Sequence, residues 1–264
     1  MSAEESLRAG RLDECLVQVQ DQIRKNPAKA EHRIFLFQLQ AILGQWEKAF
    51  SQLNVLADLD PGAVEMVQTY REALKCEILR SEVFTGQRTP LLFGEPEPWM
   101  AAVLHALQLG AKNQEREAEA MRAKALEDAP TTAGSIDGRP FAWVADADSR
   151  FGPMFEVIIN GKYFWMPIRR LRSVRLEKPV DLRDLVWLPA YLTLESGSEL
   201  PSLIPTRYPG SERSPDGQLR LARKTEWTQQ GEATFLGSGQ RILATDIDEF
   251  PLLDVREITF AASP

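Results

Sequence analysis

The polar cluster whose spacing could hold a metal ion is the segment DADSR, in which Asp146, Asp148 and Arg150 alternate with other residues. An Asp-x-Asp pair can coordinate a divalent cation. A calcium loop beginning at Asp146 would also need Gly at its sixth position and Glu at its twelfth, where Phe151 and Val157 stand. We therefore favour a structural turn in which the carboxylates accept backbone N–H bonds and Arg150 forms an ion pair.

Nucleophilic catalysis would need a histidine base held beside its nucleophile. The two histidines, His32 and His105, both fall in helical patterns of the N-terminal half, far in sequence from the cluster around Asp146. The sequence also has no phosphate-binding loop, zinc ligand set or dinucleotide fingerprint. Charged residues at predicted strand ends could in principle pair for acid–base work, which is a weak signal. These are Glu156, Asp181, Arg183, Asp184 and Glu226.

Composition and charge narrow the class of protein. A chain of 264 residues with 44% hydrophobic and 26% charged residues is typical of a globular protein with room for two modest domains. Its net charge of -7 is spread over both halves, because residues 1–130 hold 15 basic and 20 acidic side chains and residues 131–264 hold 16 and 18. We therefore expect no nucleic-acid partner. The basic run RRLRSVR at 169–175 alternates with apolar residues as a strand with one solvated face does.

We expect no secretory signal, since Met1 is followed by SAEES, which has neither a basic nor an apolar region. The most apolar window, 99–111, is too short to span a bilayer. We expect a cytoplasmic protein without a membrane segment. Its two cysteines, Cys15 and Cys76, are then expected to be buried free thiols.

The N-terminal half of the sequence contains a helical repeat. Residues 10–27 align with 44–61 at a period of 34, with a glycine, a small residue and a closing proline in register. A third copy, 113–130, lies nearly two periods further on. This pattern is typical of tetratricopeptide repeats, in which the small residue lets two helices approach and proline ends the unit. Between the copies we expect a long helix over 63–84 and an extended connector over 87–99.

After about residue 130 the pattern changes to short apolar runs broken by Gly and Pro, which predicts β structure. Asn160-Gly161 between two such runs indicates a hairpin. The strands we expect lie at 141–145, 155–159, 162–168, 170–176, 190–195, 201–206, 218–224, 233–237, 241–245 and 254–260. So many short antiparallel strands favour a small barrel or strongly bent sheet, with its four tryptophans mostly in the core.

The sequence thus predicts an α+β fold, with tetratricopeptide-like helical repeats in 1–130 and a β-rich domain in 131–264. A family resemblance adds to this. The phrases AGRLDECL, FLFQLQAILGQWEKA, FGEPEPW, IDGRPFAWVADADSRFGP, NGKYFWMP, DLRDLVWLPA and IPTRYPGSE together resemble the ImpE family, also called TagJ or SciE-type proteins.

The resemblance implies a non-enzymatic accessory protein of a bacterial type VI secretion system, without catalytic residues, metal or other cofactor. It implies binding to the N-terminal helix of the small contractile-sheath subunit and a link to the AAA+ ATPase that recycles sheath. The polar residues of the shared motifs are candidates for partner contact: Asp146, Asp148, Arg150, Arg183, Asp184, Arg207 and Tyr208. Trp143 and Trp187 of the same motifs are expected to hold the β half together.

Two other functions stay open on the residues alone. One is a metal-dependent hydrolase that uses the carboxylates of Asp146 and Asp148. The other is a ligand-binding module, for a small ligand or single-stranded nucleic acid, built on the aromatic residues of a β-barrel.

Overall fold

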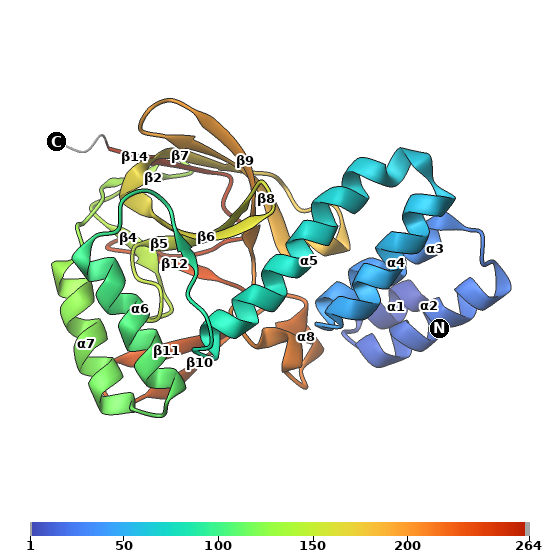
Figure 1. Cartoon of the computed structure of the whole chain (residues 1–264), viewed down its shortest axis with the longest axis horizontal. Coiled ribbons are helices and arrows are strands. Elements are labelled where there is room, and N and C mark those ends of the chain that lie inside the picture. Colours follow the sequence, from blue (N-terminus) through green and yellow to red (C-terminus); the bar gives the residue numbers. More distant parts are fainter. Residues whose placement is uncertain (1, 262–264) are drawn as a thin grey trace.

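A computed structural model describes residues 2–261 of the chain. The first helices form a stack of antiparallel neighbours on one side of the molecule (Figure 1). They are α1 (Ala3–Arg8), α2 (Leu12–Lys25), α3 (Ala30–Ile42), α4 (Trp46–Leu59) and, after a 3-10 turn at Pro61–Ala63, the long α5 (Val64–Phe84). The predicted helix over 63–84 is confirmed.

The repeated glycine has a local role at the end of a helix. Gly44 follows α3 with φ of 66°, and Gln45 N–H donates to the carbonyl of Gln40, which closes a Schellman motif. Gly10 does the same after α1 with φ of 76°. Asn113 takes this position in the third copy with φ of 60°. The signal therefore marks the end of the leading helix in each unit.

The third repeat unit does not join the stack. Its helices α6 (Pro98–Ala111) and α7 (Glu115–Asp128) lie on the far side of α5 from α1–α4 (Figure 1). They pack on the β half instead: Arg122 Nη1 donates to Thr234 Oγ1 at 2.7 Å, and Leu126 lies against Gly152. An uninterrupted stack would be the simplest outcome of the repeat, and the proline-rich connector between α5 and α6 breaks it.

Most strands of the β half belong to one sheet, which has nine strands within residues 2–261 in the order β1-β6-β5-β9-β8-β7-β14-β2-β3. Every pair is antiparallel except β1 with β6. The strands are β1 (Leu91–Leu92), β2 (Gly134–Ile136), β3 (Arg139–Phe141), β5 (Met154–Ile159), β6 (Lys162–Pro167), β7 (Leu171–Leu176), β8 (Trp187–Leu194), β9 (Glu199–Pro205) and β14 (Glu257–Phe260).

Two smaller sheets complete the β half. One contains β4 (Val144–Asp146), β12 (Ile242–Thr245) and β13 (Glu249–Pro251), and the other is the hairpin of β10 (Thr225–Gln230) and β11 (Thr234–Gly239). Four short helical turns lie between strands: Ile168–Arg170, η3 (Leu182–Leu185), η4 (Ser211–Arg213) and α8 (Gly217–Arg220). The predicted α+β class, with helices first and a mostly antiparallel sheet after them, is confirmed.

The sheet separates two hydrophobic cores. In β5, Met154 and Ile158 face the helices, whereas Phe155, Val157 and Ile159 face a second core inside the β half. Successive side chains of a strand point to opposite sides, so β5 contributes to both cores and both of its faces are buried. The inner core gathers residues from strands at both ends of the sheet order, including Ile136 and Met166. The sheet therefore bends around it.

Two short segments of the β half show which local predictions hold. The Asn160-Gly161 hairpin is confirmed, since both residues have positive φ between β5 and β6. The strand predicted at 218–224 is wrong: Asp216 caps a short helix by accepting from Gln218 N–H at 2.7 Å, and the strand begins later, at Thr225. The alternation of apolar residues there is too short to distinguish a helical turn from a strand.

The four tryptophans of the β half divide evenly. Trp165 and Trp187 are fully buried, while Trp143 and Trp227 are each 38% exposed, so the core prediction is right for two of the four. Cys15 and Cys76 are buried free thiols, as expected, and burial raises their thiol pKa values to about 11 and about 12. Within residues 2–261 no helix combines the length and hydropathy that a membrane span requires.

Candidate functional site

The DADSR segment forms a turn that ties itself together. Asp148 N–H donates to Asp146 Oδ1 at 2.8 Å, and Arg150 N–H donates to Asp148 Oδ1 at 2.9 Å. The Arg150 guanidinium binds both oxygens of Asp148, which also accepts from Gly237 N–H at 2.7 Å. These contacts confirm the structural-turn interpretation and occupy the oxygens that a metal ion would need.

Behind this turn, a buried network of charges joins α5 to the sheet. Glu156 of β5 accepts from Arg80 Nε at 2.7 Å and from Arg80 Nη2 at 2.8 Å. The same carboxylate pairs with Arg241, whose Nη1 lies 2.8 Å from Asp146 Oδ2. Tyr163 also donates its hydroxyl to Glu156. The side chains of Glu156 and Arg241 are wholly inaccessible to solvent, so their charges must be balanced locally.

The two carboxylates of this network have opposite pKa shifts. Burial alone would raise the pKa of Glu156, but Arg80 and Arg241 outweigh it and lower that pKa to about 2. Burial raises the pKa of Asp146 to about 7, because the opposing attraction of Arg241 is smaller and Asp148 repels the charge. Glu156 is therefore the permanent anion of the network, and Asp146 is the member that titrates near neutral pH.

Two further residues of the shared motifs make buried contacts: Arg207 joins the β half to α3, and Tyr208 binds within the β half. Arg207 donates to the carbonyls of Ala41 and Ile42 at the end of α3. Tyr208 donates its hydroxyl to Asp146 Oδ1 at 3.0 Å and accepts from Ile242 N–H. Both side chains are buried.

Arg183 and Asp184 organise the η3 turn. Asp184 accepts from the backbone N–H groups of Val180 and Asp181 at 2.9 and 2.8 Å, which caps the turn. Arg183 pairs with Asp181, and its guanidinium lies 4.8 Å from the ring centre of Tyr70 on α5. Its Nε finds no hydrogen-bond partner among the described residues.

The seven predicted contact residues thus fall into two groups. Asp146, Asp148, Arg207 and Tyr208 come together with Arg150 around the buried network, while Arg183 and Asp184 lie at η3. Most are internal, and their side chains are unavailable to a partner on the surface in this conformation. Those with side chains that remain partly exposed are Arg150 and Arg183, at 14% and 20%.

Sequence reasoning missed two members of the network, Arg80 and Arg241, and also Glu77, whose Oε2 lies 3.5 Å from Arg80 Nη1. Glu156 was noted only as a weak acid–base candidate. A usable signal was present for it, because a single charge inside the apolar run MFEVII demands a buried partner. The spacing of Glu77 and Arg80 on one helix face was a second signal. Arg241 gave none, since it follows a short glycine-containing polar segment, as many surface residues do.

No group of three or more His, Cys, Asp or Glu side chains within residues 2–261 is arranged to hold a metal ion. A groove and a pocket lie along α5, the groove at its first half and the pocket at its second half. The groove lies between the first turns of α5 and strands β8 and β9, and contains about 600 Å³. Its lining is mainly apolar and aromatic: Met66, Tyr70, Ile158, Pro189, Ala190, Tyr191, Pro201 and Leu203, with Glu72, Arg183 and other polar residues.

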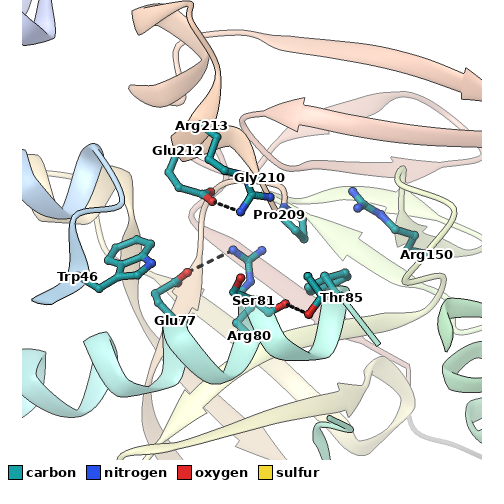
Figure 2. Close-up of a pocket in the computed structure, with 11 residues that line it drawn as sticks. Trp46, Glu77, Arg80, Ser81, Thr85, Arg150, Pro209, Gly210, Glu212 and Arg213 are labelled. Atoms are coloured by element: carbon teal, nitrogen blue, oxygen red, sulfur yellow. Dashed lines mark hydrogen bonds and ion pairs between the residues drawn. The ribbon is translucent and has the colours of Figure 1, made fainter. Parts of the chain in front are cut away.

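The pocket is smaller and strongly charged. It lies between the second half of α5 and the loop 209–213, and Figure 2 shows its lining. We call it the seam pocket and define it by Trp46, Glu77, Arg80, Arg150, Glu212 and Arg213. None of its lining residues belongs to the groove.

The model of the ImpE protein family matches residues 138–259. A relative from Pseudomonas aeruginosa, the type VI secretion system accessory component TagJ, is 50% identical over 260 residues, which cover 98% of this chain and 91% of the relative. The crystal structure of protein VPA1032 from Vibrio parahaemolyticus has a TM-score of 0.90 at 21% identity and covers 99% of this chain and 98% of its own. The whole α+β fold is therefore shared with a solved structure.

Proposed function

Because the chain belongs to the ImpE family, we propose that it is an accessory component of a bacterial type VI secretion system and acts there as an adaptor. Half of its residues are identical to those of TagJ over nearly the full length of both proteins. In this role the protein is not an enzyme, and it works in the cytoplasm.

The partner we propose is the N-terminal helix of the small contractile-sheath subunit, and delivery of sheath to the AAA+ recycling ATPase is the step it serves. The observation that supports a helical partner is the groove beside α5. An amphipathic helix buries its apolar face in such a groove through side chains spaced three or four residues apart. Met66 and Leu203 are only partly buried in the free protein, so a ligand helix would remove more of their apolar surface from water.

The charged residues at the groove add a preference for the composition of the ligand helix. Arg183 contributes a guanidinium on a side chain that is 20% exposed, while Glu72 stands on α5 and pairs with Lys75. An acidic side chain of the ligand helix next to Arg183 would gain a charge-assisted hydrogen bond. The groove therefore favours a helix with an acidic residue close to its apolar face.

The experiment is a titration of a fluorescent peptide covering the first helix of the cognate small sheath subunit with the full-length protein. We expect saturable binding with a Kd on the order of micromolar, about -8 kcal/mol. A scrambled peptide of the same composition is the control. Equal binding of both peptides, or of neither, would contradict the proposal.

The division of the chain into a helical unit, 1–130, and a β-rich unit, 131–264, is also a proposal. The contacts of Arg80 with Glu156 and of Arg207 with α3 predict that neither unit is stable alone. Expression of each segment, followed by circular dichroism, tests whether each unit needs the other for stability. A cooperative unfolding transition in either isolated segment would contradict this expectation.

A further inference from the structure

The seam pocket is unused by the proposed adaptor role, and its size limits what it can hold. It offers about 140 Å³. A cavity of similar volume accommodates a molecule the size of benzene, which has six heavy atoms. The pocket is open to solvent on one side and is lined by charged groups, so its guest must be small and polar or charged.

One side of the pocket has hydrogen-bond donors in excess. Arg150 uses Nε and Nη2 on Asp148, and its Nη1 donates to no group within residues 2–261. Arg80 uses Nε and Nη2 on Glu156, and the partner of its Nη1 is Glu77 Oε2 at 3.5 Å, beyond a good hydrogen bond. Both guanidiniums lie over the ring of Phe84, at 5.7 Å for Arg80 and 5.4 Å for Arg150, which fixes their orientation.

The other side has acceptors in excess. Glu77 Oε1 accepts from Trp187 Nε1 at 3.0 Å, whereas Oε2 has the long contact with Arg80. Glu212 pairs at 3.3 Å with Arg213, whose own side chain is 70% exposed and so holds it weakly. Figure 2 places Trp46, Glu77 and Glu212 on one side, Arg150 on the opposite side and Arg80 between them. Burial raises the pKa of Glu77, against the attraction of the Arg80 and Arg207 guanidiniums.

We propose that the seam pocket binds a small zwitterion, a free α-amino acid, with its carboxylate at Arg80 and Arg150 and its ammonium group at Glu77 and Glu212 beside Trp46. A carboxylate between two guanidiniums completes their unfilled donors. The ammonium group gains two carboxylates and the face of an indole ring. An anion or a cation alone would satisfy one side of the pocket and leave the other without a partner. The open side leaves room for an amino-acid side chain to extend into solvent.

The test is calorimetric titration of the full-length protein with glycine, L-alanine and L-serine, and with acetate and ethylammonium as half-ligands. We expect saturable binding of at least one amino acid, at least tenfold tighter than either half-ligand. Glu212→Gln removes one charge at a rim position and is expected to weaken binding at least tenfold, whereas Glu199→Gln, an exposed change on β9, is expected to leave it unchanged.

Arg150→Lys tests the other pole, because lysine keeps the charge but lacks the planar fork that binds both oxygens of Asp148 and leaves Nη1 for a ligand carboxylate. We expect at least a tenfold loss for this variant too, measured alongside its thermal unfolding to check the fold. The proposal is overturned by absence of saturable binding for all three amino acids, by half-ligands that bind as tightly, or by unchanged affinity in Glu212→Gln. Sheath-peptide binding uses the separate groove, so it is measured independently of these outcomes.

Discussion

Arg207 Nη1 lies 2.8 Å from the carbonyl oxygen of Ile42, so a side chain of the β half caps the last turn of α3. The same nitrogen also donates to the carbonyl of Arg220, and Nη2 donates to the carbonyl of Ala41 at 3.3 Å. Burial lowers the pKa of this guanidinium to about 10, which still leaves it charged at neutral pH. One arginine therefore joins three backbone segments.

Replacing Arg207 with glutamine is expected to lower the free energy of unfolding by about 2 to 3 kcal/mol, because buried carbonyls at the end of α3 lose a charged donor. Urea unfolding followed by circular dichroism measures this. Arg223→Gln is the matched control, since Arg223 caps α1 in the same manner through the carbonyl of Arg8 but at an exposed position. It should cost less than about 1 kcal/mol. Equal losses in both variants would contradict the assignment.

Glu156→Gln should destabilise the protein strongly, because it leaves the guanidiniums of Arg80 and Arg241 buried with less negative charge beside them. Breaking a buried ion pair from one side costs about 3 to 5 kcal/mol. Glu226→Gln, which removes an exposed carboxylate paired with Lys224, is the control and should stay within about 0.5 kcal/mol.

The double variant Glu156→Leu with Arg80→Met tests whether the pair itself is the cause. The double variant removes both charges of the Arg80–Glu156 pair at once, so it should lose less free energy of unfolding than the sum of its two single variants. Additive losses in urea unfolding would argue that packing, and not charge, determines the effect.

The raised pKa of Asp146 predicts that the stability of the protein falls as the pH rises towards 7. Its pKa of about 7 in the folded protein exceeds the value of about 3.9 expected when unfolded, so the folded state holds an extra proton between these values. The stability due to this group is complete below about pH 4 and is lost as the pH rises through about 7. Relative to Asp146→Asn, the wild type should lose on the order of 1 kcal/mol per pH unit across this window.

Urea unfolding of both proteins at pH 5, 6 and 7 provides the measurement. Arg241, Asp148 and Tyr208 all contact or face Asp146, and the Asp146→Asn variant retains each of them. A stability difference that stays constant or grows with pH would mean that Arg241 keeps the carboxylate ionised in the folded state.

Met66→Glu places a carboxylate on the apolar lining of the groove and should weaken sheath-peptide binding at least tenfold, or about 1.4 kcal/mol. Ile78→Glu is the matched control on the same helix, because Ile78 is 42% exposed and outside the groove. Fluorescence titration compares the two. Unchanged affinity in Met66→Glu would mean that the sheath helix binds at a site other than the groove.

The sequence predicted the helices and turns that depend on local residue chemistry. Gly10, Gly44 and the closing prolines gave the repeat helices, and Asn160-Gly161 gave the hairpin, because turn geometry requires particular residues. The place of α6 and α7 could not be predicted, since it depends on distant contacts such as Arg122 with Thr234. The polar residues of the family motifs were likewise visible, but only the structure shows that Asp146 and Arg207 face inward, because charge alone does not reveal which partner neutralises it.

The distance along the chain between Ile42 and Arg207, 165 residues, has a consequence during synthesis. At about 5 to 20 residues per second, the ribosome needs roughly 10 to 30 seconds after releasing α3 to produce the arginine that caps it. During that interval the face of the early helices that will pack on the β half stays uncovered.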